Sequence, residues 1–377
     1  MHRRNNFLLL VFLLLSLLFL NAQTQPAAQP PLSAQPANPQ PAAPQPSSTP
    51  QNSTPQSTPE TQPTGPASSL TGQSGSPAQS PDTDNGTFVF KKQVEEVVLH
   101  ATVIDNKQHI VTNLDKQNFT VYEDGHPQTI TSFRHEDIPV AMCIVVDNSG
   151  SMREKREKVN DAALNLVRAS NPNDEVCIVN FNDEYYLDQD FTSNINKLKQ
   201  GLEKIEARGG TALYDAVVAS STHLRQNAKL EKKVIIVVTD GDDNESSETL
   251  EQAVRRLQAE NGPTVYAIGI LEKDEHVRHA RRALQVMCER TGGIAFLPTT
   301  LDEVDAISRS IAHDIRSQYT IGYKPTTPQT QGGYREVRVD ARAPNYGKLT
   351  VRTKSGYYAG PEPAAGASAS LSGHPGQ

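Results

Sequence analysis

Between residues 140 and 317, short runs that are apolar at every position alternate with longer segments whose apolar residues recur at helical spacing. A strand that is apolar throughout must be buried on both faces, as happens in parallel sheets covered by helices. Parallel strands also need a crossover connection between them, which a helix supplies. Residues 138–317 therefore predict an α/β domain built on a doubly wound, mainly parallel sheet. The expected strands are 140–146, 176–181, 234–238, 264–270 and 294–296, and the expected helices are 155–168, 195–205, 212–226, 250–260, 277–290 and 304–317.

Two flanking segments, residues 87–137 and 318–360, are rich in the branched and aromatic residues typical of strands. Asp124-Gly125 indicates a hairpin turn between strands at 119–122 and 130–133, because both residues tolerate positive φ. Each segment alone would form a thin sheet with an uncovered apolar face. We therefore expect the two segments to pack together as an accessory β-sandwich. The remaining expected strands are 88–90, 94–104, 318–323, 334–342 and 349–352.

The N-terminus has the pattern of an export signal. Arg3 and Arg4 precede an apolar run from Phe7 to Leu20, which is shorter than the roughly 20 residues that span a bilayer. Residues 1–22 are therefore predicted to be a signal peptide, and the protein to reach the periplasm, the cell envelope or the exterior. Leu20 fits the cleavage rule poorly, so an uncleaved N-terminal membrane anchor remains the alternative.

Residues 23–86 differ in composition from everything that follows. Many of the 26 prolines fall here, among Gln, Ala, Ser and Thr, with few charged residues. Such a segment has too little apolar surface to offset the entropy of ordering, so we expect a disordered linker. Residues 361–377 are expected to be a disordered tail for the same reason.

The three cysteines are Cys143, Cys177 and Cys288, an odd number without metal-like spacing. All lie in apolar strand or helix segments, so buried free thiols are the first interpretation. An exported protein could also form a disulfide between Cys143 and Cys177 on neighbouring strands. A net charge of −7 and the lack of a basic run argue against nucleic acid as a partner.

Oxygen-bearing side chains follow the buried strands at the points where the strands end. Asp147, Ser149 and Ser151 follow the first strand, Thr211 precedes a helix, and Asp240 follows the strand at 234–238. The carboxyl ends of parallel strands meet at one edge of a sheet, where α/β proteins bind their ligands. Because these ligands are all oxygens, they favour Mg²⁺, with Mn²⁺ or Ca²⁺ as alternatives.

The ligand set also predicts an open coordination position. Mg²⁺ prefers six ligands and keeps several waters. Three neutral hydroxyls and two carboxylates leave at least one position for an external group. A carboxylate from a protein partner is the natural ligand for such a position, and the amides at the start of the following helix would also favour an anion.

Asp-x-Ser-x-Ser at 147–151, Gly-Gly-Thr at 209–211 and Thr-Asp-Gly at 239–241 together resemble the metal-ion-dependent adhesion site of von Willebrand factor A domains. The resemblance covers about residues 138–318 and implies a Rossmann-like fold. It further implies that the three hydroxyls contact the metal directly and that the two carboxylates often act through water. The flanking β segments are similar to those of a bacterial envelope subgroup of such proteins.

Simpler interpretations exist for each residue taken singly. Ser149 and Ser151 could cap the next helix, and Asp240 could form a turn with Gly241. The acidic loop Asp242-Asp243 and Glu245 could hold a second cation, although such loops are usually only solvated. His276 and His279 are expected to be surface residues of a charged helix. The five site residues in their expected order favour the metal site over these readings.

The leading functional prediction is a non-enzymatic module that binds an acidic side chain of a protein through a divalent cation. The alternatives are a metal-dependent hydrolase and an envelope scaffold with a purely structural metal. No candidate base stands beside the motif, which argues against the hydrolase. A dinucleotide-binding enzyme is excluded because the first strand-to-helix turn lacks a G-x-G-x-x-G run.

Overall fold

The computed structural model describes residues 96–204, 206–271 and 277–360. The predicted signal peptide, linker and tail, and the expected strand at 88–90, lie outside these residues. Among the helices that are described, none combines the length and apolar character needed to cross a membrane.

A six-stranded sheet forms the centre of the α/β domain, in the order β10-β9-β8-β5-β6-β7. Five strands are parallel and the edge strand β7 is antiparallel to β6. Every residue of β5 and of β9 is buried, which explains their unbroken apolar sequences. The doubly wound sheet is thus confirmed. Its strands are β5 (Val140–Asp147), β6 (Glu175–Phe181), β7 (Tyr185–Thr192), β8 (Lys232–Thr239), β9 (Thr264–Gly269) and β10 (Ala295–Phe296).

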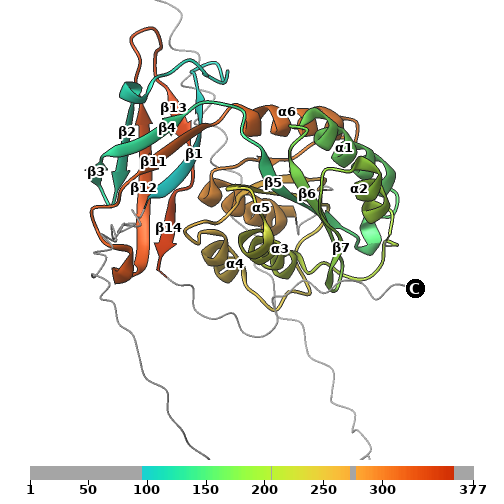
Figure 1. Ribbon diagram of the computed structural model, residues 1–377. Helices are drawn as coiled ribbons and strands as arrows, with labels where there is room; N and C mark the ends of the chain where they lie inside the picture. The colour runs from blue at the N-terminus through green and yellow to red at the C-terminus, as the bar shows by residue number, and fades with distance from the viewer. Residues whose placement is uncertain (1–95, 205, 272–276, 361–377) are drawn as a thin grey trace, which may run out of the picture. The chain divides into compact units, whose positions relative to one another are not determined.

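Helices cover both faces of this sheet, as Figure 1 shows. Alternate residues of β5 enter two separate cores: Met142 and Ile144 pack with α1, α2 and α6, whereas Ala141 and Val145 pack with α3, α4 and α5. Burial on both faces fixes the register of the strand, because a shift of one residue would exchange the two cores. The helices are α1 (Arg156–Ala169), α2 (Ile195–Leu202), α3 (Leu213–Asn227), α4 (Leu250–Leu257), α5 (Val277–Thr291) and α6 (Glu303–Arg316).

The flanking segments form the predicted accessory sandwich, which consists of two four-stranded sheets around one apolar core. Their strand orders are β13-β1-β11-β4 and β14-β12-β2-β3, so each sheet combines strands from both segments. In Figure 1 the blue-green and red strands accordingly lie side by side. The strands are β1 (Val97–Ile104), β2 (Phe119–Glu123), β3 (His126–Gln128), β4 (Ile130–Arg134), β11 (Tyr319–Tyr323), β12 (Gly333–Ala341), β13 (Thr350–Arg352) and β14 (Gly356–Ala359).

The predicted hairpin has the right turn but the wrong second strand. Asp124 and Gly125 do adopt positive φ, and they join β2 to the short strand β3 rather than to β4. β3 contains Pro127, which an edge strand tolerates because its outer side needs no hydrogen bond. β4 then crosses to the other sheet and pairs with β11.

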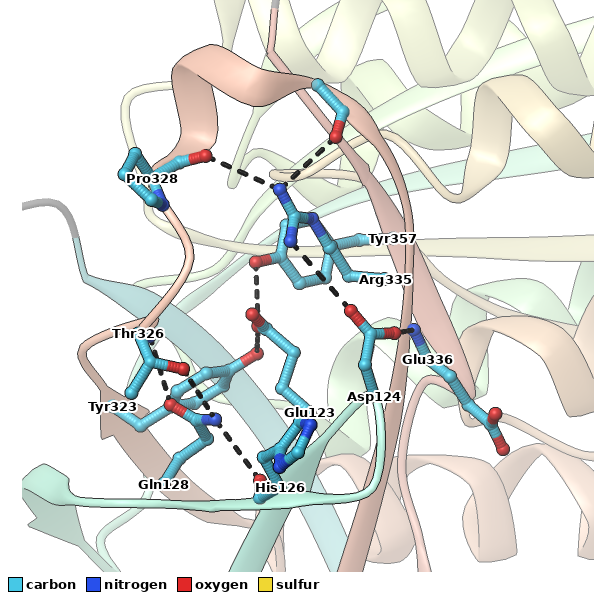
Figure 2. Close-up of polar contacts among 11 residues, drawn as sticks. Glu123, Asp124, His126, Gln128, Tyr323, Thr326, Pro328, Arg335, Glu336 and Tyr357 are labelled. Atoms are coloured by element: carbon cyan, nitrogen blue, oxygen red, sulfur yellow. Dashed lines mark hydrogen bonds and ion pairs between the residues drawn. The ribbon is translucent and has the colours of Figure 1, made fainter.

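A buried carboxylate links the two sheets of the sandwich (Figure 2). Glu123 on β2 is 2% exposed and accepts hydrogen bonds from Tyr323 on β11, at 2.5 Å, and from Tyr357 on β14, at 2.9 Å. Burial, reinforced by the Glu123 carboxylate, raises the pKa of both tyrosines. Nearby, Arg335 donates to the carbonyls of Pro328 and Gly332 and holds the loop between β11 and β12.

A disulfide joins Cys143 on β5 to Cys177 on β6, with their Cα atoms 4.7 Å apart. The first interpretation, that all three thiols are free, is therefore wrong for this pair. The two residues are register partners in the parallel pair of strands, a relation that sequence periodicity alone cannot establish. Cys288 on α5 is a buried free cysteine, as predicted.

Replacing Cys143 and Cys177 together by Ala is expected to lower the free energy of unfolding by about 3–4 kcal/mol, because the bridge closes a loop with a sequence separation of 34. Urea denaturation followed by tyrosine fluorescence measures the change. The control Cys288→Ala trims a buried cysteine without removing a cross-link. Thiol titration of the unreduced protein in denaturant should find one free thiol per chain; three would show that the bridge is absent.

Candidate metal centre

All five predicted ligands lie at the carboxyl edge of the central sheet. β5 ends at Asp147, Ser149 stands immediately before the short 3₁₀ helix Gly150–Met152, and Ser151 lies within that helix. The adjacent strand β8 ends one residue before Asp240, and Thr211 stands two residues before α3. The parallel register of β5 and β8 brings these loops together.

Asp147 is fully buried at the end of β5. One carboxylate oxygen accepts a hydrogen bond from the Ser149 amide at 2.7 Å, and the other accepts one from the Thr239 hydroxyl at 2.5 Å. Burial raises the pKa of Asp147 to about 6, with a smaller contribution from Asp240, although these hydrogen bonds oppose the rise. A divalent cation beside this carboxylate would favour its ionised form.

The hydroxyls form a continuous chain toward the second carboxylate. Ser149 Oγ lies 3.1 Å from Ser151 Oγ, and the Ser151 hydroxyl donates to Asp240 Oδ1 at 2.8 Å. Thr211 Oγ1 lies beside Gly241, the residue that follows Asp240. A Cβ atom added to Gly241 would be 3.5 Å from the Thr211 hydroxyl oxygen. The structure therefore brings the five predicted residues together.

Backbone contacts fix the loop that carries Thr211. The Gly150 amide donates to the Gly209 carbonyl at 3.2 Å, and the Arg208 amide donates to the Asn148 carbonyl at 2.8 Å. Gly209 has a φ of +74°, and a Cβ there would lie 2.3 Å from the carboxylate of Asp183. The positive φ favours glycine at this position, and any other residue would also have to displace the Asp183 carboxylate.

Asn244 and Asp183 are supporting residues that the motif analysis did not identify. The Thr211 amide donates to Asn244 Oδ1 at 2.8 Å, and the Asn244 amide returns a bond to the Thr211 carbonyl at 3.0 Å. Asp183 accepts a bond from the Gly210 amide. The only signal in the sequence was that Asp183 closely follows the strand at 176–181.

The acidic loop after Asp240 has a structural role that the sequence did not predict. Asp243 Oδ2 accepts hydrogen bonds from the Tyr214 amide at 2.9 Å and from the Ser246 hydroxyl at 2.6 Å, so it anchors the first turn of α3. Asp243 is therefore half-buried and hydrogen-bonded to the protein, rather than a freely solvated residue of the loop. His279 is exposed on α5, as expected, and His276 lies outside the described residues.

A lysine that the sequence analysis overlooked contacts the second carboxylate. Lys155 stands immediately before α1, and its ammonium lies 2.6 Å from Asp240 Oδ2. Asp240 therefore interacts with Ser151 through one oxygen and with Lys155 through the other. Helical spacing placed Lys155 at the start of a helix. It did not indicate that the Lys155 side chain would contact Asp240 at the end of β8.

The donor set fits a hard divalent cation. Two carboxylates and three hydroxyls converge, with no nitrogen or sulfur donor among them, which suits Mg²⁺, Mn²⁺ or Ca²⁺. Across the described ranges, no three His, Cys, Asp or Glu side chains cluster in a way that could hold a metal. Metal binding at this edge of the sheet would therefore depend on the hydroxyls as much as on the carboxylates.

Comparison with known proteins agrees with the motif. Residues 142–242 match the family described as the von Willebrand factor type A domain. No curated protein matches the chain.

Several solved structures are similar at low identity. An aerotolerance-related membrane protein from Bacteroides fragilis is 20% identical, with 47% of this chain and 98% of that chain covered and a TM-score of 0.39. A von Willebrand factor type A protein from Catenulispora acidiphila is 13% identical, with 72% and 74% covered and a TM-score of 0.39. Proximal thread matrix protein 1 from the mussel byssus, in a structure whose adhesion-site motif is occupied by zinc, is 16% identical, with 52% and 50% covered and a TM-score of 0.40. The family match to the von Willebrand factor type A domain covers residues 142–242, from within β5 to the loop that follows β8.

Proposed function

We propose that the protein is a non-enzymatic module that binds another protein through a divalent cation. Asp147, Ser149, Ser151, Thr211 and Asp240 would hold Mg²⁺, with Mn²⁺ or Ca²⁺ as alternatives, and would leave one coordination position for an acidic side chain of the partner. The observation that carries the proposal is a chain of hydrogen bonds between the two carboxylates: the Ser149 amide donates to Asp147, the Ser149 hydroxyl contacts the Ser151 hydroxyl, and the Ser151 hydroxyl donates to Asp240.

The bound cation would supply positive charge to the partner's carboxylate, and this chain's residues would position that charge. Asp147 is held by two hydrogen bonds and Asp240 by Ser151, so neither carboxylate has to be ordered when a partner arrives. Preorganisation of this kind reduces the entropy lost on binding. Because the hydroxyls are neutral, the charge of the cation would be offset by the two carboxylates alone.

The site would act outside the cytoplasm. The signal-like N-terminus predicts export to the periplasm, the envelope or the exterior. The Cys143–Cys177 disulfide is in keeping with an oxidising compartment, where such bridges persist. Membrane attachment would need the N-terminal apolar run to remain uncleaved.

A metal-dependent hydrolase is the alternative that shares the same ligands. It would need a general base within hydrogen-bond reach of a metal-bound water. The residue that faces Asp240 is Lys155, whose charged ammonium has no free electron pair to accept a proton. Assays with ester and phosphoester substrates in Mg²⁺ and Mn²⁺ test this alternative, and turnover abolished by Asp147→Asn would favour it.

Thr211→Ala is expected to separate partner binding from metal binding. Thr211 comes from a different loop than the 147–151 turn, and its neutral hydroxyl contributes about 0.5–1.5 kcal/mol, which water can partly replace. Metal affinity should therefore fall by no more than about tenfold. Asp240→Ala removes a charge and should abolish the binding of both metal and partner.

The measurement is affinity capture from envelope extract with elution by chelator, followed by quantitative binding of the eluted protein. Thr222→Ala on α3 is the matched control, because its hydroxyl donates to the Val218 carbonyl of its own helix. Normal partner binding by Thr211→Ala in Mg²⁺ would contradict the open-position mechanism. The scaffold with a structural metal would then be the better account.

A further inference from the structure

Lys155 forms an ion pair with a predicted metal ligand in a place that solvent hardly reaches. The ammonium lies 2.6 Å from Asp240 Oδ2, and the side chains of Lys155 and Asp240 are 13% and 1% exposed. Asp240 keeps its other oxygen on the Ser151 hydroxyl. The lysine therefore neutralises Asp240 without displacing the hydroxyl chain that leads to Asp147.

This ion pair differs from the surface pair formed three residues later. Lys158 lies 2.5 Å from Asp302, but those side chains are 54% and 83% exposed. Exposed pairs of this kind are screened by water and contribute little. The Lys155–Asp240 pair is shielded from solvent. The positive charge of the Lys155 ammonium therefore acts strongly on any cation that approaches the Asp240 carboxylate.

The charge balance of the site follows from this pair. Asp147 and Asp240 contribute two negative charges when ionised, and Lys155 cancels one of them. Arg156 also interacts electrostatically with Asp147, but its guanidinium donates to the Leu202 carbonyl rather than to either carboxylate. With Arg156 adding further positive charge near Asp147, a dication would meet a site with at most half the net negative charge that its two carboxylates imply.

We infer that Lys155 is a built-in counter-ion of Asp240 that weakens metal binding by the free protein and makes it depend on the negative charge that an acidic partner brings. The inference rests on the proposed metal-dependent binding function and specifies how that site is regulated. A partner carboxylate would restore the missing charge, so metal and partner would strengthen each other's binding by the same factor. The protein would then hold its cation firmly only in the complex.

Lys155→Met tests this inference, because it keeps the aliphatic side chain and removes the charge. Mn²⁺ affinity of the full-length protein is expected to rise by about tenfold or more, as a single charge near a shielded ion can produce. Lys155→Arg keeps the charge and should bind Mn²⁺ like the wild type. Lys158→Met, which breaks the exposed pair with Asp302, should leave the affinity unchanged.

The measurement is titration of Mn²⁺ followed by electron paramagnetic resonance, with and without acetate at constant ionic strength. Acetate serves as the probe for a carboxylate and is expected to tighten Mn²⁺ binding more in the wild type than in Lys155→Met. Circular dichroism checks that each variant is folded, and Lys155→Gln replaces Lys155→Met if the latter is not.

The outcomes separate this inference from the proposed function. Equal or weaker Mn²⁺ binding by the charge-free variants, with normal binding by the wild type, would overturn the counter-ion role and leave the metal site intact. An acetate effect of equal size in wild type and variant would overturn the link to the partner. Absence of Mn²⁺ binding in the wild type and in both charge-free variants would contradict the metal site itself.

Discussion

Removal of residues 87–137 is expected to turn the protein into aggregates rather than into a smaller soluble domain. The deletion removes β1 and β4, which are the two hydrogen-bonded neighbours of β11, and it removes β2, which pairs with β12. All five residues of β11 are buried. An apolar strand with both edges unpaired is a template for association between chains.

The same deletion removes half of the sandwich core. Leu99 and Val121 are fully buried in it, and Glu123 is the acceptor for the Tyr323 and Tyr357 hydroxyls. Size-exclusion chromatography with light scattering should therefore show large species. The matched control is deletion of residues 361–377, which should leave a monodisperse protein. A soluble, monomeric chain starting at residue 138 would contradict the shared sandwich.

Asp147→Asn is expected to abolish metal binding while leaving the fold intact. Asn keeps the shape of the side chain and an oxygen for the Ser149 amide, but it removes the charge that a cation needs. Mg²⁺ at 100 times its dissociation constant should stabilise the wild type by about 2.7 kcal/mol and the variant not at all. Thermal unfolding with and without Mg²⁺ measures the difference.

Asp174→Asn is the matched control for this substitution. Asp174 is also a buried aspartate, but it lies at the opposite end of β5, where it accepts a hydrogen bond from the Val140 amide at 2.8 Å. Its loss should lower stability equally with and without Mg²⁺. Mg²⁺ stabilisation that survives in Asp147→Asn would remove Asp147 from the ligand set.

The sequence predicted those strands that are buried on both faces, because such strands must be apolar at almost every position. β5 and β8 read as strands because almost every position is buried, and the motif residues follow them directly. The five predicted ligands come together because parallel strands end at one edge. Both conclusions follow from the burial of the strands and from their parallel arrangement, which the alternation of strands and helices indicates.

The parts that the sequence did not predict depend on pairing between segments or on where a side chain points. β7 is a partly exposed edge strand that mixes polar and apolar residues, so its sequence shows no clear alternation of apolar and polar positions. β4 has the composition of a hairpin strand, yet its partner is β11, nearly 200 residues away. The Cys143–Cys177 bridge required the β5–β6 register, and the Lys155–Asp240 pair required a side-chain direction.

The central claim is that one divalent cation binds at the carboxyl edge of β5 and β8. Its most direct test is a stoichiometric Mn²⁺ titration of chelator-treated protein, followed by electron paramagnetic resonance. We expect one site per chain in the wild type and in Asp174→Asn, and none in Asp147→Asn or Asp240→Ala. Unchanged Mn²⁺ binding in the last two variants, or no binding by the wild type and the charge-free Lys155 variants alike, would contradict the central claim.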